Sequence, residues 1–168
     1  MRITLSILFF LSSFALADIT CQDLVDSIEL AFDRADSVVM EVWLEQSIFE
    51  IGYTKLQLYK DVDTWKSEVL EKRGAQHQKK EGGSAEPDIG FDCKASDSKI
   101  IILETENGYL LEVIESDKSK KIKHWILKFS SRAGLLLPTE VIAKFEISVL
   151  TIPLAGQAVT KLSNWTFP

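Results

Sequence analysis

The sequence predicts an α+β domain in which one N-terminal amphipathic helix lies on the concave face of a curved antiparallel sheet, or an incomplete barrel, of about nine strands. Helical spacing of apolar residues is confined to residues 20–35. After Asp36 the apolar period changes from 3.6 to 2, which is typical of strands. Turn signals then divide the remainder into hairpins. At 168 residues, of which 46% are hydrophobic and 26% charged, the chain has the size and composition of one globular domain.

Residues 1–17 are typical of a secretory signal peptide. Arg2 supplies the positive charge, Ile3–Leu11 the apolar stretch, and Ala15-Leu16-Ala17 the small-x-small cleavage site. The apolar stretch is shorter than the roughly 20 residues of a transmembrane helix. We therefore expect cleavage near Ala17-Asp18, a periplasmic or secreted location, and a single domain over residues 18–168.

The chain contains two cysteines, Cys21 and Cys93. An even number of cysteines in an oxidising compartment favours a disulfide, which here would close a loop of about 72 residues. The alternative is two separate buried thiols.

The helix over residues 20–35 begins at Thr20, a plausible N-cap with Asp23 three residues later. Asp26, Glu29 and Asp33 lie on its opposite, solvated face. Its apolar stripe follows i, i+3, i+4, i+7 spacing: Cys21, Leu24, Val25, Ile28, Ala31, Phe32 and Ala35.

Three strands are expected next. Apolar and polar residues alternate from Val38 to Ile48, and Gly52 marks a bend or a bulge. Leu56 and Leu58 belong to a second strand. A turn over residues 61–64 precedes a third strand, of which one face is formed by Trp65, Ser67 and Val69.

Residues 72–88 contain no apolar residue larger than alanine apart from one proline, and they predict a flexible polar loop. The loop is either a functional rim or lid or a tolerated insertion.

The second half is a series of hairpins. Lys99–Glu106 and Tyr109–Ser116 flank Asn107-Gly108, a signal for a type I′ turn that would pair Ile102 with Val113. Pro138 should lie at a strand start or a bulge. The remaining expected strands are a short piece at Ile89–Cys93, then Ile122–Phe129, Leu135–Thr151 and Ala158–Phe167.

Both faces of the predicted sheet contain apolar residues. In the Asn107-Gly108 hairpin, one face holds Ile102 and Leu111 and the other holds Leu103 and Leu110. A helix of about 16 residues is roughly 24 Å long and cannot cover both faces. The surplus must be buried by closure around a dry core, by an apolar ligand in a cavity, or by a protein partner.

Three local patterns stand out in the C-terminal part: residues 126–129 before a turn, residues 137–141 after it, and residues 162–167 in the last expected strand. In these patterns and in the order of its elements, the chain resembles the periplasmic outer-membrane lipoprotein carrier (LolA-like) superfamily. The resemblance implies an incomplete barrel whose hydrophobic cavity holds acyl chains without catalysis. The chain departs from the family in having one strong helix instead of several, and its two cysteines are no signature of the family.

The resemblance implies a soluble, exported carrier, expected to be a monomer, whose partners are a lipid or acylated lipoprotein and a membrane-associated donor or acceptor protein. The alternative is an envelope interaction module with a dry core. Strand alternation, rather than a matched motif, places these residues around the cavity: Val25, Ile28, Phe32, Val38, Met40, Val42, Leu44, Leu56, Leu58 and Trp65.

No arrangement of residues predicts an enzyme, a cofactor or a metal site. The chain has no G-x-S-x-G motif, and its two histidines, His77 and His124, lack a zinc-binding pattern. A net charge of −6 without a basic cluster argues against a nucleic-acid partner.

Overall fold

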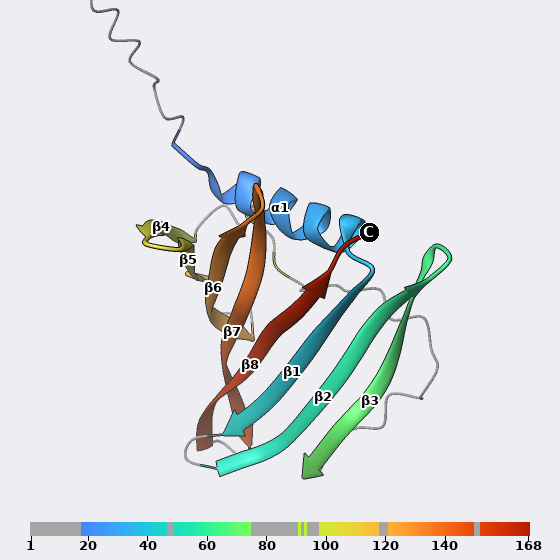
Figure 1. Ribbon diagram of the computed structural model, residues 1–168. Helices are drawn as coiled ribbons and strands as arrows, with labels where there is room; N and C mark the ends of the chain where they lie inside the picture. Colours follow the sequence, from blue (N-terminus) through green and yellow to red (C-terminus); the bar gives the residue numbers. More distant parts are fainter. Residues whose placement is uncertain are drawn as a thin grey trace, which may run out of the picture.

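The computed structural model describes residues 18–46, 49–74, 91, 93, 98–117, 121–149 and 152–168. In these ranges one helix precedes eight strands that form a single curved, open antiparallel sheet (Figure 1). The strand order is β3-β2-β1-β8-β7-β6-β5-β4, so that β3 and β4 are the edges. The elements are α1 (Cys21–Arg34), β1 (Ser37–Gln46), β2 (Phe49–Asp61), β3 (Thr64–Gly74), β4 (Lys99–Thr105), β5 (Gly108–Ile114), β6 (Ile122–Arg132), β7 (Leu135–Val149) and β8 (Ile152–Thr166).

The described part of the chain contains eight strands rather than the nine expected. The ninth was placed at Ile89–Cys93, where the two described residues, Phe91 and Cys93, lie outside any strand. The polar loop also begins later than expected, because residues 72–74 continue β3. Residues 75–90 and the expected signal peptide lie outside the described residues.

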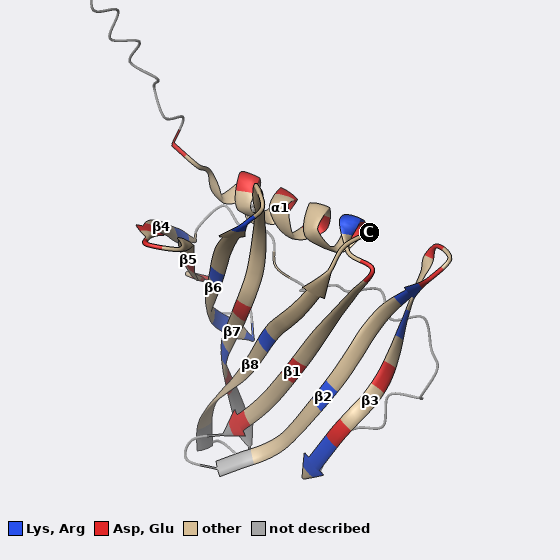
Figure 2. Cartoon of the chain, in the orientation of Figure 1, with Lys and Arg blue, Asp and Glu red and all other residues tan. Residues whose placement is uncertain are grey.

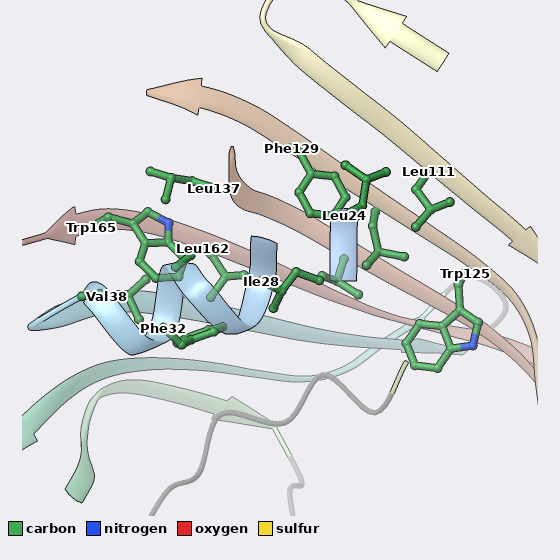
Figure 3. Close-up of a cluster of buried hydrophobic side chains, with 14 of the residues drawn as sticks. Leu24, Ile28, Phe32, Val38, Leu111, Trp125, Phe129, Leu137, Leu162 and Trp165 are labelled. Atoms are coloured by element: carbon green, nitrogen blue, oxygen red, sulfur yellow. The ribbon is translucent and has the colours of Figure 1, made fainter. Parts of the chain in front are cut away.

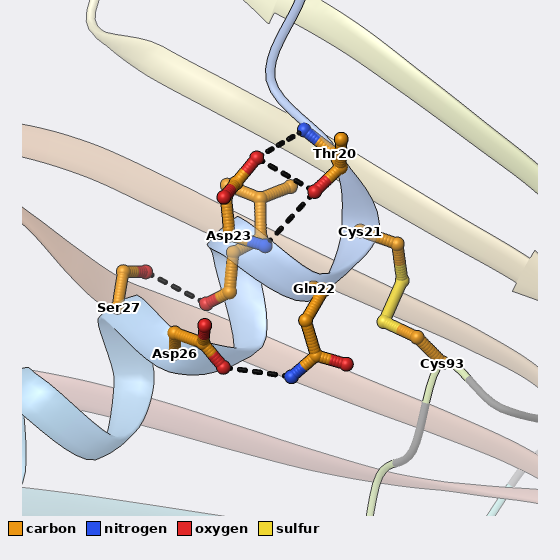
Figure 4. Close-up of a disulfide and its surroundings, with 8 residues drawn as sticks. Thr20, Cys21, Gln22, Asp23, Asp26, Ser27 and Cys93 are labelled. Carbon is orange, nitrogen blue, oxygen red and sulfur yellow. Dashed lines mark hydrogen bonds between the residues drawn. A yellow bond between two sulfur atoms is a disulfide. The ribbon is translucent and has the colours of Figure 1, made fainter.

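Helix α1 begins where its capping residues predict. The Thr20 hydroxyl accepts a hydrogen bond from the Asp23 backbone N–H at 3.2 Å, and the Asp23 carboxylate accepts one from the Thr20 N–H at 2.8 Å (Figure 4). This capping box satisfies two of the backbone donors that a helix start leaves without partners.

The core lies between α1 and one face of the sheet, which we call the inner face. Leu24 and Ala31 of the helix are fully buried, as are Val38, Leu111 and Leu127 of the strands (Figure 3). Aromatic side chains close the end of the core nearest the helix C-terminus, since the Phe32 ring lies 5.0 Å from the Trp165 ring and 5.8 Å from the Trp65 ring. Such edge-to-face contacts add to the stabilisation from apolar burial.

The first residue of α1 is also held by a covalent bond. A disulfide joins Cys21 to Cys93, as the cysteine count predicted, with a Cα–Cα distance of 6.0 Å across 72 residues of sequence (Figure 4). The bond attaches the helix start to the segment that precedes β4.

The outer face of the sheet carries a row of alternating charges across six strands, beside an apolar row that includes Trp43, Val159 and Ile142. The charged row appears in Figure 2 as alternating blue and red bands. Within it, Lys55 and Glu41 form an ion pair at 2.9 Å, and Lys128 pairs with Glu140. Strand register aligns the whole row, from β6 to β3, in the order Lys128, Glu140, Lys161, Glu41, Lys55 and Glu71.

One sequence expectation about a glycine was wrong and another was confirmed. The β4–β5 turn consists of Glu106 and Asn107, with Thr105 opposite Gly108, so Ile102 pairs with Leu111 rather than Val113. Gly108 instead lies in strand β5, where a Cβ would be 2.2 Å from the Phe129 carbonyl oxygen of β6, so that a larger residue would clash. Gly52 marks a bulge, as expected: it pairs with Leu44 at the point where the β1–β2 register shifts.

Removal of the disulfide should destabilise the fold. In the chain-entropy account a loop of this length contributes about 4 kcal/mol. We expect Cys21→Ser/Cys93→Ser to lower the free energy of unfolding by that order, measured by urea denaturation. Reducing agent should have the same effect on the wild type and none on the double variant. Equal stability of the two proteins without reductant would contradict the prediction.

The capping box should make α1 sensitive to acid. Its hydrogen bonds from Thr20 hold the pKa of the Asp23 carboxyl below its usual value of 3.8. The carboxylate therefore stabilises the fold above about pH 4, and this contribution disappears as pH falls through the lowered pKa. We expect Asp23→Asn to lower the melting temperature at pH 7 but to differ little from wild type near pH 2. Thr20→Ala should cost about 1 kcal/mol at pH 7.

Candidate functional site

The inner face has a second region, farther along the strands from α1, which we call the inner surface. It consists of residues that strand register places side by side on the same face as the core: Met40, Val42 and Leu44 of β1, Thr54 and Leu56 of β2, Val69 of β3, and Ala158 and Thr160 of β8. Six of the eight are apolar. The strands that carry them extend well beyond the helix in Figure 1.

Burial decreases along these strands with distance from the helix. Val38 is 0% exposed and Leu58 is 2% exposed where α1 packs over them. Val42, Leu44 and Leu56, farther along the same face, are only half-buried, and Val69 is 38% exposed. The inner surface is thus an apolar, partly accessible continuation of the core.

The structure separates the predicted cavity residues into two groups. Five are buried in the core under the helix: Ile28, Phe32, Val38, Leu58 and Trp65. Met40 is partly buried and packs against that core. The half-buried remainder comprises Val25 on the helix together with three residues of the inner surface: Val42, Leu44 and Leu56.

A cleft of about 810 Å³ lies between α1 and the β2–β3 turn. We call it the α1 cleft. Its apolar part combines the buried Phe32 and Trp65 with the exposed Leu30 and Val62. Its charged part contains four carboxylates and one ammonium: Asp26, Glu29, Asp33, Asp63 and Lys60.

Lys60 connects the two sides of the α1 cleft, which are formed by α1 and by the β2–β3 region. Its Nζ donates a hydrogen bond to the Asp33 carbonyl oxygen and lies 5.5 Å from the centre of the Trp65 ring. Its backbone N–H donates to the Asp36 carbonyl oxygen at 2.8 Å. The end of β2 is therefore attached to the C-terminal end of the helix.

The acidic side of this cleft was not identified as a site from the sequence, which placed Asp26, Glu29 and Asp33 only on a solvated helix face. Their spacing of three and four residues is the available signal, because it aligns the side chains along one side of a helix. The β2–β3 turn that faces them begins more than 25 residues later, and nothing in the local sequence links the two.

The histidine that the structure describes, His124, lies on the outer face of the sheet. Its Nε2 is buried without a hydrogen-bond partner, 3.6 Å from a carboxylate oxygen of Glu112. A bulge at Lys123 places His124 on the face opposite Ile122. No group of three or more potential metal ligands occurs among the described residues.

No known protein family matches the sequence, and no curated protein matches it significantly. Within the described ranges, the helix is too short and too polar to cross a membrane.

Val62, in the turn beside the α1 cleft, is both exposed and strained. It is 89% exposed and has φ of 60°, a left-handed conformation that is unfavourable for a β-branched residue. We expect Val62→Gly to raise the free energy of unfolding by about 1 kcal/mol in urea titrations. Glu68→Gly, at an exposed position inside β3, should instead lower it. A destabilised Val62→Gly protein would show that the valine side chain makes a compensating contact.

Proposed function

We propose that this protein is a non-catalytic carrier or binding protein for an apolar ligand, a lipid or an acylated lipoprotein. The supporting observation is the inner surface: an apolar, half-buried region that continues a fully buried core along the same face of the sheet. The outer face also carries apolar side chains, but among them lie cross-strand charge pairs such as Lys55–Glu41 and Lys128–Glu140. An apolar surface like the inner surface is typical of a ligand groove.

We also propose a position for the helix. In this proposal, α1 occupies the concave side of the curved sheet and closes one end of an open half-barrel, while the inner surface at the other end remains available to a ligand. This arrangement agrees with the resemblance to the LolA-like carriers, and it requires one helix where those carriers use several. It also assigns the protein to the periplasm or another extracytoplasmic space, where the disulfide is stable.

Affinity would come from apolar burial. Each methylene that leaves water contributes about 0.8 kcal/mol, so ten methylenes supply about 8 kcal/mol before the cost of ordering the ligand. Such a gain is enough for specific binding without any charged contact inside the groove.

A charged side chain within the inner surface should abolish this binding. Val42 is half-buried there and lies outside the fully buried core. We expect Val42→Glu to reduce binding of the neutral fluorescent probe N-phenyl-1-naphthylamine at least tenfold, with an unchanged far-ultraviolet spectrum. The control is Leu103→Glu, which adds the same charge at a 51%-exposed position on edge strand β4 and should bind the probe normally.

Native mass spectrometry provides a second test of the carrier function. Native mass spectrometry of the purified protein should reveal a bound lipid that solvent extraction releases. If the protein is bare and the probe binds neither wild type nor control, the carrier proposal is wrong.

The second candidate, an interaction module with a dry core, has its own supporting observation. Edge strand β4 and its neighbour β5 expose apolar side chains: Ile100 is 40%, Leu103 51% and Ile114 37% exposed. Exposed apolar edges pair readily with other chains. Concentration-dependent sedimentation without extractable lipid would favour this function.

A further inference from the structure

We propose that edge strand β4 pairs with β4 of a second copy of this chain, in an antiparallel, two-fold symmetric dimer centred on Ile102. The inference goes beyond the proposed carrier function and does not depend on it. Strand β4 lies at the opposite side of the sheet from β1, β2 and β3, which carry most of the inner surface (Figure 1). Three properties of the described residues support the dimer.

The first property is the exposure of an apolar edge. Strand β4 contains four consecutive aliphatic residues, Ile100–Leu103, and no charge between Lys99 and Glu104. Five of its seven residues are exposed, including Ile100 at 40% and Leu103 at 51%. Within the described part of the chain, β5 is the only strand beside β4, so the backbone groups along the other side of β4 have no strand to pair with. Such an edge pairs readily with another strand.

The second property is the difference between the two edges of the sheet. Edge strand β3 has five charged residues among eleven: Lys66, Glu68, Glu71, Lys72 and Arg73. Charged side chains protect an edge strand against pairing. Pairing of β4 with β3 of another copy would place charges opposite the aliphatic residues and would continue from copy to copy without closing. A β4–β4 contact instead joins the two apolar edges and closes after two copies.

The third property is the fit of β4 to itself. In an antiparallel pair with a two-fold axis, a centre at Ile102 pairs all seven residues of β4. This register places Ile102 opposite Ile102 of the second copy on one face of the sheet. On the other face it places Ile101 opposite Leu103 of the second copy. Directly opposite residues in such a pair lie about 5 Å apart, so these aliphatic side chains would cover one another.

The ends of the paired strands are complementary in charge. The same register places Lys99 opposite Thr105 of the second copy, beside Glu104 of its β4 and Glu106 of its β4–β5 turn. Each end therefore brings one ammonium close to two exposed carboxylates, and the two-fold axis repeats this contact at the other end. Among the seven paired residues, no like charges lie directly opposite each other. The pattern of apolar and charged residues in β4 thus fits a second copy of the same strand.

Sedimentation equilibrium of the purified protein tests the association. Because seven paired residues form a small interface, we expect a reversible equilibrium between monomer and dimer in the micromolar range, without larger species. A monomer mass that persists at millimolar concentration would overturn the proposal. Growth beyond the dimer would also overturn it, because a β4–β4 contact closes after two copies.

Two matched variants localise the contact. Leu103→Lys places a charge in β4, opposite Ile101 of the second copy, and we expect it to raise the dimer dissociation constant at least tenfold. Leu70→Lys makes the same change on edge strand β3 at nearly the same exposure, 50% against 51%. This control should dimerise as the wild type does, and both variants should keep the wild-type far-ultraviolet spectrum. Equal dissociation constants for the two variants would contradict a contact through β4.

Cysteine cross-linking tests the register. Ile102→Cys should form an intermolecular disulfide under mild oxidation, because the two-fold axis brings its two Cα atoms to about 5.5 Å from each other. Ile100→Cys is the control: its two copies would lie four residues apart along the pair, about 14 Å, which is beyond the reach of a disulfide. Non-reducing gel electrophoresis measures both. Preferential cross-linking of Ile100→Cys would show that the pair is not centred on Ile102.

The dimer and the carrier function are tested separately. A dimer from which solvent extraction releases lipid supports both proposals. A monomer that carries lipid overturns the dimer alone. A dimer that binds neither lipid nor the neutral probe overturns the carrier function and leaves the β4 contact in place.

Discussion

The burial of one helix against a much longer sheet is the constraint on which this structure depends. Helix α1 has 14 residues and is therefore about 21 Å long. Strands β7 and β8 have 15 residues each and extend for about 50 Å. The helix therefore covers only part of the inner face. Side chains beneath it, such as Val38, are sealed, and side chains beyond it, such as Val42, remain half-buried.

The two faces of the sheet are covered by different groups. On the outer face, cations cover an aromatic pair: Lys161 lies 5.0 Å from the Trp43 ring, Trp43 lies 5.2 Å from Tyr53, and Arg73 lies 4.5 Å from Tyr53. With the row of alternating charges, these contacts place charged groups over part of the outer face. Among the described residues, no helix or strand other than α1 covers the inner face, and the ligand proposal therefore concerns that side.

Helix α1 is held at both ends. At the N-terminal end of the helix, a disulfide joins Cys21 to Cys93. At the C-terminal end, Lys60 donates hydrogen bonds from its Nζ to the Asp33 carbonyl oxygen and from its backbone N–H to the Asp36 carbonyl oxygen. These two attachments fix the position of α1 over one end of the inner face.

Local patterns were sufficient for much of the fold. Thr20 and Asp23 predicted the helix start, because capping involves residues only three apart. The change of period after Asp36 predicted strands, and Pro138 lies at a bulge as expected, because proline lacks the donor that a regular ladder needs. The even number of cysteines predicted the disulfide between Cys21 and Cys93.

Contacts between distant segments decided the rest. Gly108 lies so close to the Phe129 carbonyl oxygen of a third strand that a Cβ would be 2.2 Å from it. Rules for two-stranded turns take no account of a third strand, so they could not predict where this turn lies. The sequence by itself predicted the helix, most of the strands, the disulfide and an excess of apolar side chains. Only the tertiary structure decided which of those side chains α1 seals and which stay accessible. It also brought the helix carboxylates opposite the β2–β3 turn, because the position of α1 on the sheet is set by packing across the whole chain.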